Sequence, residues 1–81
     1  MICSVKLFAV ARERIGQSVI QVELPAGASA AQLRSALAAQ FPDLSSLLPH
    51  SRLAINNDYA TDSTPLAPTA EIALIPPVSG G

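Results

Sequence analysis

The chain has 81 residues but a single cysteine, one histidine and few charged side chains. Cys3 alone cannot form an internal disulfide, and a cysteine-ligated zinc or iron–sulfur site needs several thiolates. No apolar run approaches the roughly 20 residues of a membrane-spanning helix. The few basic residues form no stripe or cluster, which argues against nucleic acid and anionic membranes as partners. With no signal peptide pattern before the first strand, we expect a soluble, cytoplasmic protein.

Groups that could perform catalysis are also sparse. His50 follows Pro49 in an expected loop, and no nucleophile or orienting partner marks it as a catalytic base. The acidic residues are scattered, so the sequence indicates neither a metal site nor a pair of catalytic carboxylates. Outside the last two residues the glycines are Gly16 and Gly27, which excludes a glycine-rich phosphate loop. We therefore expect that the protein has no catalytic site of its own and binds no cofactor.

The N-terminal half predicts a hairpin followed by a helix. Residues 3–9 and 18–24 alternate between apolar and polar, as half-buried strands do. Residues 10–15 break this alternation and contain Arg12-Glu13-Arg14, which predicts a solvated connector. The spacing of Ser29 and Gln32 matches a capping box at the start of a helix over residues 30–40. Proline at position 42 ends that helix, because the residue before a proline is pushed out of the helical region.

The C-terminal half predicts shorter strands. Residues 43–50 read as a connector with one helical turn around 44–48, and residues 53–55 as a strand. Residues 56–58 suit a tight turn before a very short strand at residues 59–60. Residues 61–70 are predicted to form turns. Residues 71–75 are apolar on both faces, as in an interior strand. The order predicts an α+β fold of the β-grasp, ubiquitin-like class, with a mixed sheet of four to five strands on one main helix.

The last six residues, Pro76-Pro77-Val78-Ser79-Gly80-Gly81, predict a functional tail beyond a domain of residues 1–75. The two prolines favour an extended, stiff segment that holds the end of the chain clear of the sheet. Two glycines without side chains leave the terminal carboxylate open to an enzyme. Such a carboxylate could attack ATP held by that enzyme, and a sulfur nucleophile could then displace AMP. The alternative is a chance ending without a function.

Three apolar residues predict a docking surface beside the tail. The alternation places Phe8 and Ile75 on the face of the sheet opposite the buried residues, and Tyr59 on a neighbouring strand. If the first and last strands are adjacent, Phe8 and Ile75 lie close together. An exposed apolar patch next to a functional tail is typical of a partner-binding surface. The alternative is that a loop of the same chain covers these residues.

Together these motifs resemble the family of molybdopterin synthase small subunits, which are sulfur carriers in molybdenum cofactor synthesis. The resemblance covers nearly the whole chain and is most specific in the Pro-Pro-Val-Ser-Gly-Gly ending. It is carried by residues 5–9, 11–13, 16, 33–42, 54–56, 62–66 and 71–81. One departure is clear, because residues 67–70 replace the Asp-Gly-Asp type of turn that is usual in the family. Pro68 suits the second position of a β-turn, so we expect the connection to survive.

The resemblance implies a cycle of activation and sulfur transfer. A ubiquitin-activating-like adenylyltransferase uses ATP to adenylate Gly81, and the product is converted to a thiocarboxylate. Gly80 leaves room for an enzyme to reach Gly81. The segment that inserts into the large synthase subunit contains Pro76, Pro77, Val78 and Ser79. The residues that dock against the large subunit are Phe8, Tyr59 and Ile75. Only there does the sulfur meet the pterin precursor, cyclic pyranopterin monophosphate, within a heterotetramer of two small and two large subunits.

Three other functions stay open at this stage. A sulfur carrier of another pathway, such as thiamine synthesis, would share the activation chemistry, although those carriers are usually shorter and lack the Pro-Pro-Val-Ser ending. A ubiquitin-like modifier would join Gly81 to lysines of target proteins. A plain interaction module would keep its function without Gly80 and Gly81.

Overall fold

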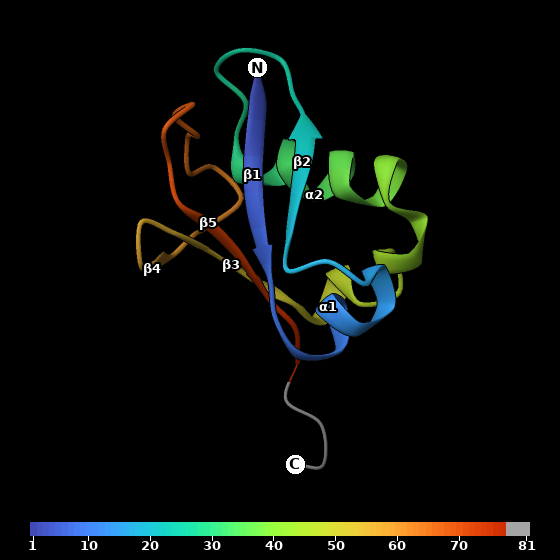
Figure 1. Cartoon of the computed structure of the whole chain (residues 1–81). Coiled ribbons are helices and arrows are strands. Elements are labelled where there is room, and N and C mark those ends of the chain that lie inside the picture. Colours follow the sequence, from blue (N-terminus) through green and yellow to red (C-terminus); the bar gives the residue numbers. More distant parts are fainter. Residues whose placement is uncertain (78–81) are drawn as a thin grey trace.

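The computed structural model describes residues 1–77 of the chain, and residues 78–81 lie outside the description (Figure 1). Its elements follow one another as β1 (Ile2–Leu7), α1 (Ala9–Ile15), β2 (Val19–Glu23), α2 (Ala30–Gln40), the 3-10 helices η1 (Pro42–Leu44) and η2 (Leu48–His50), β3 (Arg52–Ile55), β4 (Asp58–Tyr59) and β5 (Ile72–Ile75). The strands form one sheet in the order β2-β1-β5-β3-β4. The predicted mixed sheet of the β-grasp fold is confirmed.

The last strand of the chain lies in the middle of the sheet. β5 runs parallel to β1 on one side and antiparallel to β3 on the other. Both of its edges are hydrogen-bonded, which confirms the predicted interior strand. The expected burial of both faces is wrong, because Ile72 and Leu74 are buried but Ala73 and Ile75 on the outer face are half-buried. Figure 1 shows the described chain leaving the sheet from the end of this central strand. This position decides where the tail begins.

The core lies between the sheet and α2. On β1 and β5 every second residue faces inward, and the inward residues are fully buried. Leu33 and Leu37 of α2 meet them from the other layer and have no exposed surface. Removing this apolar surface from water is the main favourable term in folding. The largest of the fully buried side chains are Cys3, Val5, Leu7, Val22, Leu33, Leu37, Leu44, Leu53, Ile72 and Leu74.

The main helix begins and ends where the sequence predicts. The Ser29 hydroxyl accepts a hydrogen bond from the Gln32 N–H at 3.4 Å, and the Gln32 side chain accepts one from the Ser29 N–H at 2.9 Å. This reciprocal pair is the expected capping box. The predicted tight turn between β3 and β4 is present too, with φ of 52° at Asn56 and 70° at Asn57. Two successive left-handed residues fit the type I′ turn that joins antiparallel strands.

The predicted solvated connector between the first two strands is wrong, because a seven-residue helix, α1, occupies it. Ala11 is completely buried, and Val10 and Ile15 are half-buried against the core. The helix ends at Gly16, whose φ of 78° is left-handed and whose N–H donates to the Arg12 carbonyl. Two turns are too short for a helical period to stand out in the sequence. The glycine cap was the signal that could have indicated a helix.

Two smaller boundaries also differ from the prediction. β1 ends at Leu7, and Ala9 is exposed with a φ of 50° instead of continuing the buried face of a strand. This left-handed turn redirects the chain into α1 and leaves Phe8 on the outer side of the sheet. The single helical turn expected around residues 44–48 is replaced by η1 and η2, which lie on either side of it.

Candidate docking surface at the base of the tail

The tail starts from a buried proline. Ile75 ends β5 half-buried, Pro76 is buried and Pro77 is exposed. Pro76 was expected to stand clear of the sheet, and its burial instead makes it part of the folded domain. Pro77 is therefore the first tail residue that a partner can reach. The predicted tail residues Val78, Ser79, Gly80 and Gly81 lie outside the described residues.

Phe8 and Ile75 lie beside each other on the outer face of the sheet. The β1·β5 register pairs Leu7 with Leu74, so the residues that follow are neighbours. Both line one hollow of about 440 Å³, together with Pro77 and residues of α1. The Phe8 side chain is 46% exposed, so no loop among residues 1–77 covers it. The structure thus brings these two residues together as expected, while their docking role stays a prediction.

Tyr59 lies on the other side of Ile75. It is 63% exposed and lines a second hollow of about 320 Å³ with Ile75, Pro77, His50 and Arg52. The Arg52 guanidinium stacks over the Tyr59 ring, with its central carbon 4.9 Å from the ring centroid. We call Phe8, Arg52, Tyr59, Ile75 and Pro77 the tail-base surface.

Sequence reasoning missed Arg52 and His50 as members of this region. The predicted third strand began at residue 53, whereas β3 begins at Arg52, which pairs with Ile75 of β5. A strand extended by one residue would have placed Arg52 on the outer face by simple alternation. His50 was expected to be an isolated loop residue. It ends η2 and lines the second hollow.

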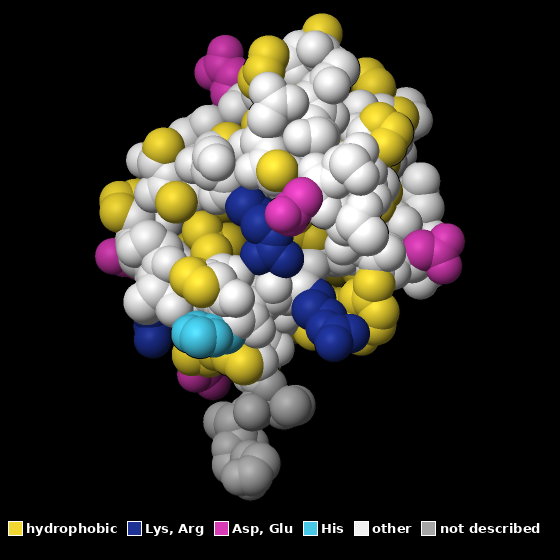
Figure 2. All heavy atoms as spheres, turned by 180° about the vertical axis from the view of Figure 1, so that it is seen from behind, with side chains coloured by type: hydrophobic (Ala, Val, Ile, Leu, Met, Phe, Trp, Pro, Cys, Tyr) yellow, Lys and Arg dark blue, Asp and Glu magenta, His cyan; other side chains and the backbone are white. Residues whose placement is uncertain are grey.

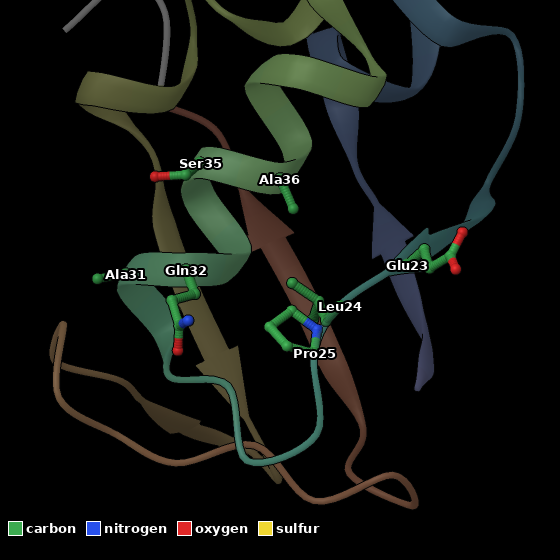
Figure 3. Close-up of a pocket in the computed structure, with 7 residues that line it drawn as sticks. All are labelled: Glu23, Leu24, Pro25, Ala31, Gln32, Ser35 and Ala36. Carbon is green, nitrogen blue, oxygen red and sulfur yellow. The ribbon is translucent and has the colours of Figure 1, made fainter.

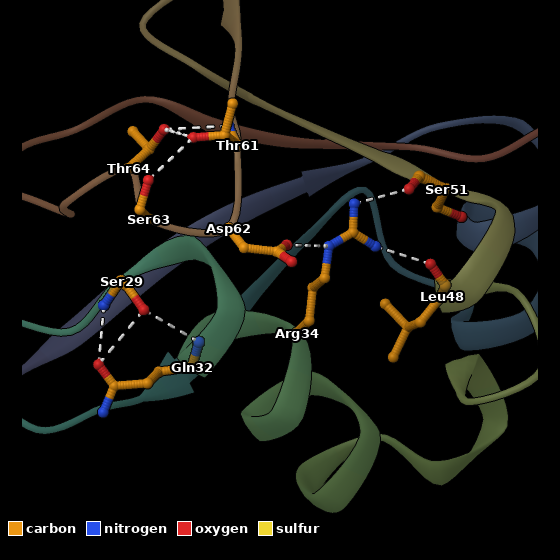
Figure 4. A network of polar contacts seen from close by, with 9 residues as sticks. All are labelled: Ser29, Gln32, Arg34, Leu48, Ser51, Thr61, Asp62, Ser63 and Thr64. Atoms are coloured by element: carbon orange, nitrogen blue, oxygen red, sulfur yellow. Dashed lines mark hydrogen bonds and ion pairs between the residues drawn. The ribbon is translucent and has the colours of Figure 1, made fainter.

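The start of β3 is held by a network around Arg34 of α2 (Figure 4). The guanidinium donates to the carbonyl of Leu48 at 2.7 Å and to that of Ser51 at 2.8 Å. The Ser51 hydroxyl, itself buried, donates to the Leu47 carbonyl at 2.7 Å. These contacts fix the backbone immediately before Arg52. The network therefore connects the main helix to one side of the tail-base surface.

Other surfaces of the described residues offer less. A hollow of about 350 Å³ lies between the end of β2 and α2, but in Figure 3 the Glu23 carboxylate and the Ser35 hydroxyl point away from each other. No set of polar groups converges there on a ligand. On the face shown in Figure 2, basic and acidic side chains are scattered and form no continuous patch of one sign. Across residues 1–77, every helix is too short or too polar to cross a membrane.

A mixed sheet that grasps one helix, with the chain leaving from its central strand, defines a β-grasp protein of the ubiquitin-like class. Comparison with known proteins makes this more specific. The chain belongs to the ThiS family, whose model matches residues 5–81. It is 38% identical over 77 residues to the molybdopterin synthase sulfur carrier subunit of Arabidopsis thaliana, covering 95% of this chain and 80% of the relative.

Solved structures agree on the fold. The small archaeal modifier protein 1 of Haloferax volcanii superposes with a TM-score of 0.83 at 28% identity, covering 95% of this chain and 98% of the other. A complex of subunits 1 and 2 of the molybdopterin-converting factor from Helicobacter pylori contains a chain that superposes with a TM-score of 0.69. Both chains are covered completely, and the identity of 24% supports likeness of fold alone.

Proposed function

We propose that this protein is the sulfur-carrier small subunit of molybdopterin synthase. The observation that carries the proposal is the Gly80-Gly81 ending on a ThiS-family domain that is related to a named sulfur carrier subunit. The tail-base surface supports it, because exposed apolar and aromatic side chains surround the point where the tail begins. The protein supplies the carrier, and the catalytic groups belong to its partners.

The chemistry begins at the terminal carboxylate. One oxygen of Gly81 attacks the α-phosphate of ATP in an adenylyltransferase, which forms an acyl-adenylate and releases pyrophosphate. A sulfur nucleophile at the oxidation level of sulfide then attacks the acyl carbon and displaces AMP, so that a thiocarboxylate remains. In the large subunit this sulfur passes to cyclic pyranopterin monophosphate, and water restores the carboxylate. Two such transfers supply the two sulfurs of the dithiolene in molybdopterin.

The tail-base surface is the proposed contact with the large subunit. A tail that enters another protein's active site brings its own base against the rim of that site. Phe8 and Tyr59 are the most exposed aromatic side chains there, at 46% and 63%. Aromatic side chains are typical of the few residues that contribute most of the binding energy at an interface.

A second candidate function is protein modification. The likeness to small archaeal modifier protein 1 favours it, because both chains share the whole fold at 28% identity. A modifier would use the same adenylation and then transfer Gly81 to a lysine amine. The two functions therefore diverge only after activation.

Mass spectrometry distinguishes these functions. We expect that incubation with ATP, the cognate activating enzyme and a sulfur donor adds the mass of one sulfur-for-oxygen exchange at Gly81. Adding the large subunit and cyclic pyranopterin monophosphate should then yield molybdopterin, and a variant lacking Gly80 and Gly81 is the control. A thiocarboxylate that yields no molybdopterin would favour a carrier of another pathway. Gly81 found in isopeptide links to lysine, with no thiocarboxylate, would establish the modifier instead.

A further inference from the structure

Arg52 is the charged member of the tail-base surface. It is the first residue of β3, it is exposed, and it pairs with Ile75 in the sheet register. Its guanidinium lies over the Tyr59 ring at 4.9 Å. Stacking on an aromatic face restricts the long side chain and leaves the edge of the guanidinium plane available for hydrogen bonds. The contact thus favours one position of the arginine before any partner arrives.

Among residues 1–77, no carboxylate lines the hollow beneath Arg52. The described residues that line it are His50, Arg52, Tyr59, Ile75, Pro76 and Pro77, and none carries a carboxylate. The one ion pair found among residues 1–77 joins Arg34 to Asp62, on another part of the molecule. Arg52 is flanked by a tyrosine, an isoleucine and prolines. A partner that covers these apolar side chains would also remove water from the positive charge of Arg52. Such a charge is costly to bury without a carboxylate opposite it.

We propose that Arg52 determines partner specificity by pairing with a carboxylate of the large synthase subunit. The inference rests on the proposed function, since a subunit that takes in the tail must cover its base. A planar guanidinium binds a carboxylate through two parallel hydrogen bonds, and exclusion of water by Tyr59 and Ile75 strengthens the pair. Losing one partner of a buried pair mainly speeds dissociation. Under the proposed function the large subunit forms a lasting complex, so a slowly dissociating contact stabilises that complex. The activating enzyme must release the small subunit after each reaction, so we assign the carboxylate to the large subunit.

Calorimetric titration of the whole small subunit with its large subunit tests this pairing. We expect Arg52→Gln to weaken binding about tenfold or more. Arg52→Lys keeps the charge but loses the planar stack, so we expect an intermediate loss. Arg12→Gln is the matched control, because it removes the same charge from α1 and lines neither hollow. Circular dichroism should give all variants the wild-type spectrum, since Arg52 is exposed.

The outcomes separate this inference from the proposed function. If the wild-type protein does not bind the large subunit, the proposed function fails and the inference fails with it. If wild type binds and Arg52→Gln binds within twofold, the inference alone is overturned. Loss of adenylation with unchanged binding to the large subunit would also overturn it, because the carboxylate would then belong to the activating enzyme. An equal loss in Arg12→Gln would show a general effect of net charge and no specific pair.

Discussion

Replacing Arg34 by methionine should destabilise the protein by about 2–3 kcal/mol. The variant keeps an unbranched apolar stem but removes the donors to the carbonyls of Leu48 and Ser51, which are bound at 2.7 and 2.8 Å. A hydrogen bond from a charged group contributes about 1.5–3 kcal/mol. Two such bonds sum to about 3–6 kcal/mol. The Arg34 side chain is 29% exposed, so water replaces part of the lost interaction and reduces the expected loss to about 2–3 kcal/mol.

The ion pair of Arg34 contributes little to this figure. Its Nε lies 3.9 Å from a carboxylate oxygen of Asp62, and the Asp62 side chain is 83% exposed. Pairs of this kind contribute about 0–1 kcal/mol, because water and salt screen them. Asp62→Asn is therefore the matched control, and we expect it to cost less than about 0.5 kcal/mol. The comparison separates the two backbone contacts from the electrostatic attraction.

Equilibrium unfolding in urea, followed by far-ultraviolet circular dichroism, measures both effects. With a slope of about 1 kcal/mol per molar urea, Arg34→Met should lower the midpoint by about 2 M. Amide hydrogen exchange should also speed up at Ser51, whose N–H donates to the Leu48 carbonyl in the same network. A loss below about 0.5 kcal/mol, or an equal loss in Asp62→Asn, would refute the assignment of the stabilisation to the two carbonyl contacts.

Three further predictions concern the tail, the docking surface and the cap of α1. Deleting Gly80 and Gly81 should abolish thiocarboxylate formation, read by intact mass, without moving the urea midpoint; retained activation would contradict the carrier role. Phe8→Ser should weaken binding to the large subunit about tenfold in calorimetry with folding unchanged, since Phe8 is 46% exposed, and equal affinity would remove it from the interface. Gly16→Ala should cost about 1 kcal/mol from its φ of 78° alone, because nothing lies within 4 Å of the added Cβ, and an unchanged midpoint would contradict this strain.

Local patterns were enough to predict much of the fold. The capping box of Ser29 and Gln32 and the following proline define α2 from neighbouring residues, and the structure confirms both ends. Alternation in residues 3–7 and 72–75 depends on the side-chain period of a strand, which is also local. The α1 helix escaped prediction because its stability comes from packing Ala11 against a core assembled from distant segments.

The proposed chemistry of the tail was predicted from the sequence alone, because the Gly80-Gly81 motif can be recognised without knowing the fold. The surface around it is not, since Phe8, Arg52, Tyr59 and Ile75 come from four separate segments. They meet only because β5 enters the sheet between β1 and β3, and that pairing depends on hydrogen bonds between segments far apart in the chain. Tertiary structure alone decided which side chains lie around Pro77, where the proposed tail leaves the sheet.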